Sequence, residues 1–377
     1  MKSICYQDRH KQAQIRFDDK TNMMTFLDKI KAFLKIDEGL APGHNHHVDA
    51  LKGMLIIFVV FAHTIQLNHP LHDNSYLYLT FSSFAMPLFM LLSGFIVSSQ
   101  LCNTLWGYLK KYTLRLIVPF FVWAVFSYGF FLLYNDHRLP AAMFDVSLPV
   151  YLWNTAKSPG NGLWFLWVLF LNSVLLFSVL KLVRVRNWVR WENYFIIASI
   201  LLSRTASTDL FGLNEFKTYY TYYAVGFFVF KYFDVVKAHR KIFYAISIVA
   251  FPLLLMGFQR TGLPAFYPYL AQIFGDTGLA RLFVSIYKYA LAFVGMALLS
   301  FLLERVRQTG FYRFACWVGT LTLDIYVCHI YFIVACGDAL WQYLAVSVFA
   351  FVCSIALTLL LLKRFKITRL LFLGQSR

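Results

Sequence analysis

The sequence predicts an all-α polytopic membrane protein with about ten transmembrane helices and with both termini in the cytoplasm. Hydrophobic residues make up 59% of the 377 residues and charged residues 14%, whereas soluble domains carry roughly 25% charged residues. The mean hydropathy is +0.60. Apolar runs such as LFMLLSGFIV at 88–97 do not alternate with polar residues, as the strands of a membrane barrel do. Helices are therefore the spanning elements.

Ten apolar segments approach the roughly 20 residues that a helix needs to cross a bilayer core of about 30 Å. The fifth is the weakest, because only FIIASILL is strongly apolar before the polar run SRTASTD. The positions of Lys and Arg support it: a ten-span topology puts 27 of them in cytoplasmic segments and 6 in outer loops, as the positive-inside rule requires. The predicted spans are 53–70, 78–98, 115–134, 163–181, 191–209, 218–234, 242–258, 283–303, 316–336 and 341–362.

Composition divides the chain into three parts: a cytoplasmic segment at 1–48, a transmembrane domain at 49–362 and a basic cytoplasmic tail at 363–377. Residues 1–22 are polar and show no cleavable signal peptide. MTFLDKIKAFLKI at 24–36 places apolar residues at helical spacing with lysines between them. This pattern is typical of an amphipathic helix on the inner membrane surface or of an ordinary linker helix.

The first span carries three ionisable groups, Asp49, Lys52 and His63. Lys52 and His63 are eleven positions apart, which leaves about 20° after three helical turns, and Asp49 is offset by about 40°. If the helix begins before residue 49, all three share one face. His63 then lies about 15 Å above Gly53, near the bilayer midplane. Ionisable groups at that depth are costly and usually functional; the alternative is a histidine that hydrogen-bonds a neighbouring helix for packing.

Polar and small residues also mark other spans. The Ser-Gly pair at 93–94 predicts a close approach to another helix. Asp324 and His329, in the ninth span, are five positions apart and do not share a helix face. We therefore expect each to hydrogen-bond a neighbouring helix, and not to form a catalytic dyad. Lys111 and Arg115, at the cytoplasmic edge of the third span, are either a positive-inside signal or a site for phosphate groups.

Five sequence elements, in order, resemble the membrane-bound acyltransferase 3 family and its fucose 4-O-acetylase-like, polysaccharide O-acetyltransferase branch. DALKGMLIIFVVFAHT at 49–64 resembles the family's first helix, in which a basic residue, ten others and a histidine follow one another; this chain has Lys52 where Arg is usual. FAMPLFMLLSGF at 84–95 is similar to FHMPLFFFLSGF, with Ala85 in place of His. The other three are KKYTLRLIVPF at 110–120, GLWFLWVLFLNSVLLF at 162–177 and VGTLTLDIYVCHIYF at 318–332.

The resemblance implies an integral O-acyltransferase of the plasma (bacterial inner) membrane. It would transfer acetyl from cytoplasmic acetyl-CoA to a hydroxyl of a cell-surface glycan (O-antigen, capsule or exopolysaccharide) or its lipid-linked precursor. His63 is then the essential group, as general base or as transient acyl carrier. Lys52 would contact a donor phosphate, with Asp49 orienting it at i, i+3. Lys111 and Arg115 would neutralise further phosphates of CoA.

Acceptor binding is expected at the outer end of the fourth span, where Asn161 and Trp164 lie, because aromatic faces stack on sugar rings. The YYTYY run at 219–223 is expected in the interfacial aromatic belt.

The partners expected are acyl-CoA, the glycan or lipid-linked sugar, and membrane lipid. No nucleic acid is expected, since the cations do not share one face. The scattered cysteines and the HNHH run at 44–47 lack the spacing of a metal site, so we expect no metal and no permanently bound cofactor.

Two other function classes fit parts of the pattern. A membrane glycan exporter would also have about ten spans and buried ionisable groups, although the two halves of the chain show no self-similarity of the kind that transporters often have. A regulatory membrane component with an inactive site would fit the departures at Lys52 and Ala85. Loss of O-acetyl groups with continued glycan export favours the enzyme, and failure of export favours the transporter.

Overall fold

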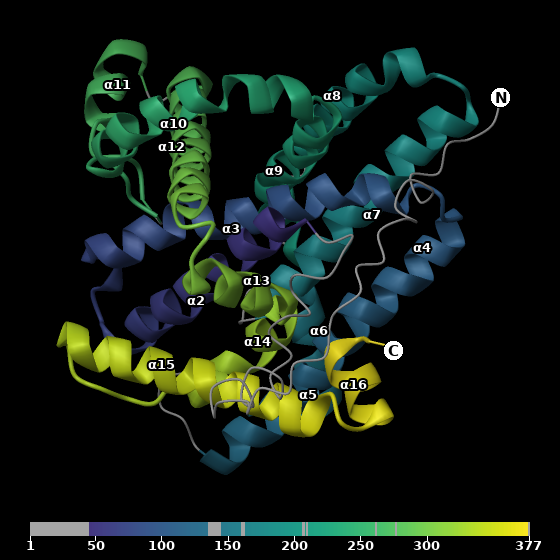
Figure 1. Ribbon diagram of the computed structural model, residues 1–377, viewed down its shortest axis with the longest axis vertical. Coiled ribbons are helices and arrows are strands. Elements are labelled where there is room, and N and C mark those ends of the chain that lie inside the picture. The colour runs from purple at the N-terminus through teal and green to yellow at the C-terminus, as the bar shows by residue number, and fades with distance from the viewer. Residues whose placement is uncertain are drawn as a thin grey trace, which may run out of the picture.

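The computed structural model describes residues 45–134, 145–159, 163–205, 208, 210–260, 262–275 and 277–375, and these residues form helices and turns without a strand (Figure 1). The predicted helix at 24–36 lies outside the described residues. The main helices are α2 (His46–Asn68), α3 (Tyr76–Val97), α4 (Leu105–Tyr112), α5 (Val118–Tyr134), α6 (Leu148–Lys157), α7 (Trp164–Val185), α8 (Glu192–Ser203), α9 (Leu213–Lys231), α10 (Phe233–Leu255), α11 (Tyr267–Phe274), α12 (Gly278–Arg305), α13 (Gly310–Thr320), α14 (Thr322–Cys328), α15 (Leu340–Leu357) and α16 (Lys366–Leu373).

Short turns extend several of these helices. A π-helical turn, η4 (Thr113–Ile117), joins α4 to α5, and another, η9 (Thr358–Leu362), continues α15. A 3₁₀ turn, η8 (His329–Phe332), follows α14 directly. The remaining 3₁₀ turns are η2 (His72–Asn74), η3 (Ser98–Gln100), η6 (Val189–Trp191) and η7 (Leu210–Gly212).

Seven helical stretches of the described chain are long and apolar enough to cross a membrane, and α13 with the α14–η8 stretch makes an eighth if this pair, bent by 67°, is one span. Helices also form at the fifth and sixth predicted spans. However, α8 has only 12 residues, about 18 Å of helix against a core of about 30 Å. In α9 the apolar run is interrupted by Glu215 and Lys217 and ends at Lys231. The all-helical membrane fold is confirmed, whereas the count of ten and the orientation of the termini stay predictions.

Two helix crossings in the centre of the molecule depend on glycine. Where α2 crosses α13, a Cβ on Gly53 would overlap the carbonyl of Ala315, and a Cβ on Gly319 would overlap the carbonyl of Asp49. The backbones of the two helices therefore touch, which small residues permit in membrane proteins. This crossing brings α2, which carries His63, against the broken helix whose last part carries His329 (α2, α13 and α14 in Figure 1).

The second crossing joins α3 to α9. Gly94 packs on the carbonyl of Tyr223, and Gly226 packs on the carbonyl of Leu91. The close approach predicted at Ser93–Gly94 is thus confirmed, and it draws α9 into the core next to α3. Helices α10, α11 and α12 lie together at the upper left in Figure 1, and α12 packs against α3.

Polar contacts fix the end of α2 that lies beyond His63. The Asn68 side chain donates to the carbonyl of Val334 at 3.3 Å and accepts from the backbone N–H of Cys336 at 2.8 Å. Thr64 is hydrogen-bonded to Ser347 of α15 at 3.0 Å. These bonds anchor α2 to α15 and to the segment that follows η8.

A carboxylate in that segment, Asp338, is also bound. It accepts hydrogen bonds from the hydroxyl of Tyr343 at 3.0 Å and from His69 at 3.3 Å. These two bonds lower the pKa of Asp338.

Candidate active site

The structure brings two histidines from distant parts of the sequence together. The imidazole rings of His63 in α2 and His329 at the start of η8 have centroids 5.3 Å apart, with planes tilted by 36°. His63 is half-buried, and its Nδ1 lies 2.9 Å from the Oε1 atom of Gln66. His329 is only 2% exposed. His63 is thus the more exposed of the two histidines, and His329 is buried.

His329 hydrogen-bonds within its own helix, so the prediction that it bonds a neighbouring helix is wrong. Its Nδ1 lies 2.8 Å from the carbonyl oxygen of Tyr326 and 3.2 Å from that of Ile325. Its Nε2 has no hydrogen-bond partner among the described residues. Helical spacing along one segment could not reveal the pairing with His63, because it depends on the 67° bend before α14 and on the crossing with α2.

The N-terminal end of α2 carries the charges predicted there. Helix α2 begins at His46, so Asp49, Lys52 and His63 lie on one continuous helix. The Nζ of Lys52 is 3.9 Å from a carboxylate oxygen of Asp49, so the predicted i, i+3 contact forms. Arg115, in the π-helical turn, is near enough for its charge to act on Lys52. These groups form a mixed cluster with a net positive charge.

Lys111 lies on the exposed side of the same cluster. Its Nζ donates to the Oε1 atom of Gln100 at 2.7 Å, and its charge interacts with that of Arg115. The structure thus gathers the two predicted donor-binding cations near one end of the bundle, on the same side as Lys52. Their role toward a donor stays a prediction.

Asp324 is part of a second ionic cluster. Its carboxylate is 1% exposed, lies 2.9 Å from the Nζ of Lys363 and accepts a bond of 2.8 Å from Gln375. Both partners lie in the segment after α15, but neither Lys363 nor Gln375 is in a helix, so the predicted bond to a neighbouring helix forms instead with non-helical residues of the C-terminal segment. Asp324 and His329 contact different partners, as their different helix faces predicted.

Aromatic rings gather at the predicted acceptor side. The ring of Trp164, the first residue of α7, stacks on that of Tyr219 in α9 with centroids 5.0 Å apart. Both residues are half-buried. Asn161, the other predicted acceptor residue, lies outside the described residues.

The tyrosine run at 219–223 is mostly core, so its assignment to the interfacial aromatic belt is wrong. Tyr220, Tyr222 and Tyr223 are all less than 5% exposed. The hydroxyl of Tyr220 lies 2.8 Å from the Oγ of Ser199. The glycine crossing with α3 turns this face of α9 inward, a packing detail that the aromatic composition of the run does not encode.

Arg260, in the loop after α10, was not singled out from the sequence. Its guanidinium lies over the ring of Tyr78 at 5.3 Å from the centroid. Its positive charge acts on both His63 and Tyr219. The loop thus brings a cation toward the histidine pair from the side of the molecule opposite to Lys52, which only the folded structure reveals.

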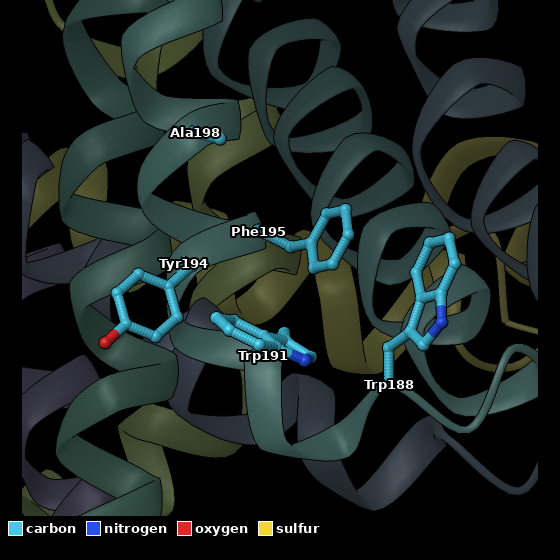
Figure 2. A pocket seen from close by; sticks show the side chains of 5 residues that line it. All are labelled: Trp188, Trp191, Tyr194, Phe195 and Ala198. Atoms are coloured by element: carbon cyan, nitrogen blue, oxygen red, sulfur yellow. The ribbon is translucent and has the colours of Figure 1, made fainter.

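A surface hollow lies apart from these residues. Trp188, Trp191, Tyr194, Phe195 and Ala198 line it, between the end of α7 and α8 (Figure 2). The guanidinium of Arg190 lies 5.3 Å from the ring centre of Trp191. An aromatic surface with a cation is typical of a membrane interface, and none of the residues predicted for the site lines it.

Comparison with known proteins identifies the family. A family model described as an acyltransferase domain matches residues 45–363. The chain belongs to the acyltransferase 3 family. The match includes both histidines of the pair, the Lys52 and Arg115 cluster, and Trp164, so all five lie within the acyltransferase 3 domain.

Two curated relatives of this acyltransferase 3 protein carry the name nodulation protein NolL. The one from Sinorhizobium fredii (strain NBRC 101917 / NGR234) is 27% identical over 157 residues, 40% of each chain. The one from Mesorhizobium japonicum (strain LMG 29417 / CECT 9101 / MAFF 303099) is 25% identical over 217 residues, 53% of this chain and 52% of the relative. The chain thus matches about half of these relatives' length or less. No solved structure matches it.

Proposed function

We propose that the protein is a membrane O-acyltransferase that transfers acetyl from cytoplasmic acetyl-CoA to a hydroxyl of a cell-surface glycan or its lipid-linked precursor. The observation that carries the proposal is the half-buried His63 beside His329, inside the acyltransferase 3 domain. Histidine is the commonest general base in enzymes. The location proposed is the bacterial inner membrane, where a cytoplasmic donor and an exported glycan lie on opposite faces.

In the proposed reaction His63 acts as a base. Its Nε2 takes the proton of the acceptor hydroxyl, and the oxygen attacks the thioester carbonyl. The carbon–sulfur bond then breaks, and the CoA thiolate receives the proton from His63. The products are one O-acetyl ester and one CoA thiol. In an alternative order, His63 first accepts the acetyl group from acetyl-CoA, and the acceptor hydroxyl then attacks that group. The products are the same.

The two ends of the site support different substrates. Cations such as Lys52, Lys111 and Arg115 suit the phosphates of CoA, because charge-assisted hydrogen bonds to phosphate are among the stronger polar contacts. The stack of Trp164 on Tyr219 suits a sugar ring, since aromatic side chains offer an apolar face and, in tyrosine, a hydroxyl.

The test is an NMR comparison of surface glycan from wild-type cells, deletion cells and cells that carry His63→Ala at the wild-type membrane level. We expect O-acetyl signals in the wild type alone, with glycan exported in all three strains. Retained O-acetyl signals in His63→Ala cells would contradict the assignment of His63. Loss of exported glycan in the deletion strain would favour an exporter.

A further inference from the structure

The loop between α10 and α11 carries a cation that the proposed reaction does not use. Arg260 is exposed, and its guanidinium lies over the ring of Tyr78 at 5.3 Å from the centroid. Lys288 of α12 donates a hydrogen bond to the carbonyl of Gly262 at 3.3 Å. The chain two residues beyond Arg260 is therefore held against α12, which gives this cation a defined place.

Arg260 lies close to His63. The ring that it covers, Tyr78, packs with Phe61 and Ile65 of α2 in one apolar cluster. These two residues stand two positions before and two positions after His63, and the charge of Arg260 acts on His63 itself. An anion bound by the guanidinium would therefore lie near the ring that is proposed to take the acceptor proton.

The same cation is close to the proposed acceptor end of the site. Its charge acts on Tyr219, whose ring stacks on that of Trp164 with centroids 5.0 Å apart. A positive charge beside a base disfavours the protonated form of that base. Arg260 alone thus opposes the step in which His63 gains a proton, unless a negative charge offsets it.

The described part of the protein does not pair Arg260 with such a negative charge. The carboxylates on this side of the molecule are Asp73, Asp338 and Glu215. None of them forms an ion pair with Arg260, and Asp73 and Asp338 each contact a histidine instead. A bound substrate is therefore the source from which an anion can reach this guanidinium.

We propose that Arg260 binds an anionic group that the acceptor carries near the sugar to be acetylated, so that it selects an anionic acceptor. The group is a phosphate of a lipid linker or a carboxylate of the glycan, because a guanidinium forms paired, charge-assisted hydrogen bonds with either. Its charge offsets that of Arg260 and favours proton transfer to His63. The inference rests on the proposed function, in which His63 is the base.

Two other roles for Arg260 predict different kinetics. A residue that stabilises the negative charge of the tetrahedral intermediate lowers kcat with every acceptor when it is lost. A surface cation that only packs on Tyr78 leaves the kinetics unchanged when it is lost. Binding of an anionic acceptor instead raises KM for that acceptor and leaves KM for acetyl-CoA unchanged.

The test uses three acceptors prepared from the deletion strain. They are the lipid-linked glycan, the same glycan freed from its lipid phosphate by mild acid, and the freed glycan with its carboxyl groups reduced. Purified protein in detergent transfers radiolabelled acetyl from acetyl-CoA to each of them. Comparing KM in Arg260→Gln with KM in the wild type, for each acceptor separately, cancels the contribution of the lipid itself.

We expect Arg260→Gln to raise KM for the lipid-linked glycan about tenfold, as the loss of one hydrogen bond between charged groups would. The ratio of the two KM values should fall to about one at the first preparation that lacks the anion. A fall after mild acid identifies the phosphate, and a fall only after reduction identifies the carboxylate. Arg260→Lys keeps the charge without the planar fork and should raise KM for the lipid-linked glycan about threefold.

Arg204→Gln is the matched control. Arg204 is also exposed and also lies 5.3 Å from a tyrosine ring centre, that of Tyr289. Its guanidinium donates to the hydroxyl of Thr221 at 3.1 Å. Its loss should leave KM for each of the three acceptors within about twofold of the wild type.

Three kinetic results would overturn the inference: a ratio of about one with every acceptor, an equal rise with every acceptor, or the same rise in Arg204→Gln. If Arg260→Gln does not accumulate, Arg260→Lys decides, and an unchanged KM for the lipid-linked glycan overturns the inference. Binding of radiolabelled lipid-linked glycan without acetyl-CoA separates the two proposals. Wild-type protein that binds this glycan about tenfold more tightly than Arg260→Gln, but transfers no acetyl, would refute the proposed function alone. Equal binding by both proteins would overturn the inference.

Discussion

Asp324 and His329 lie five residues apart on the same broken helix, and both are almost fully buried, yet their surroundings differ completely. Asp324 has partners from the segment after α15, at 2.9 Å and 2.8 Å. His329 keeps one ring nitrogen without a partner and faces a second, half-buried histidine. A buried charge with an ion-pair partner holds segments together, whereas a buried ring nitrogen without a hydrogen-bond partner, beside a second and more exposed histidine, is typical of a reactive site. We therefore assign a structural role to Asp324 and a catalytic setting to His329, although the two residues are only about one and a half helical turns apart.

The largest effect that would sharpen this comparison is expected from His63→Ala. Removing the base should lower acetyl transfer at least about 100-fold, since general-base catalysis contributes about 10²- to 10⁴-fold. Radiolabel transfer at matched membrane level measures it. His69→Ala is the matched control: it removes a histidine one position past the end of the same helix, bonded to Asp338, and should leave the rate within about twofold. A similar loss of acetyl transfer in His63→Ala and His69→Ala would contradict the assignment of His63 as the base.

Asp324→Asn should act on stability and not on chemistry. Loss of the carboxylate charge leaves Lys363 without its ion-pair partner, at a cost of about 3 kcal/mol, the lower end for buried pairs because Lys363 is partly exposed. The unfolding temperature in detergent should fall, while transfer per folded molecule stays within about threefold. Adding Lys363→Met should recover most of the stability. A folded Asp324→Asn protein without activity would place Asp324 in the chemistry after all.

Lys52→Ala tests the donor end of the site. If Lys52 contacts a phosphate of CoA, its loss should raise KM for acetyl-CoA about tenfold, equivalent to about 1.4 kcal/mol, with a smaller change in kcat. Lys52→Arg, which restores the residue usual in the family, should keep KM within about threefold. An unchanged KM for acetyl-CoA in Lys52→Ala would mean that Lys52 contacts Asp49 but not the donor.

The smallest effect is expected from Trp164→Ala at the acceptor end. Losing one aromatic face should raise KM for the glycan about two- to tenfold, since an aromatic contact contributes about 0.5–1.5 kcal/mol beyond its buried area. KM for acetyl-CoA should not change. Trp164→Phe keeps a ring and should lie near the wild type. A change in the donor KM instead would move Trp164 out of the acceptor site.

Contacts within one helix could be predicted from the sequence, whereas contacts between residues far apart in the sequence could not. Helical spacing predicted the Asp49–Lys52 contact, and the Ser-Gly pair predicted the close crossing of α3. The pairing of His63 with His329 depends on a bend at Leu321 and on glycines in two separate helices, which no single segment encodes. The approach of Arg260 depends on the course of a loop, and the burial of the tyrosine run depends on which face of α9 meets α3.

The most direct test of the central claim uses the purified wild-type protein in vesicles, with radiolabelled acetyl-CoA and unacetylated glycan extracted from the deletion strain. Labelled acetyl on the glycan and released CoA thiol should appear in equal amounts, and neither should appear with His63→Ala protein. Folded wild-type protein that releases no thiol and labels no glycan would contradict acetyl transfer from acetyl-CoA.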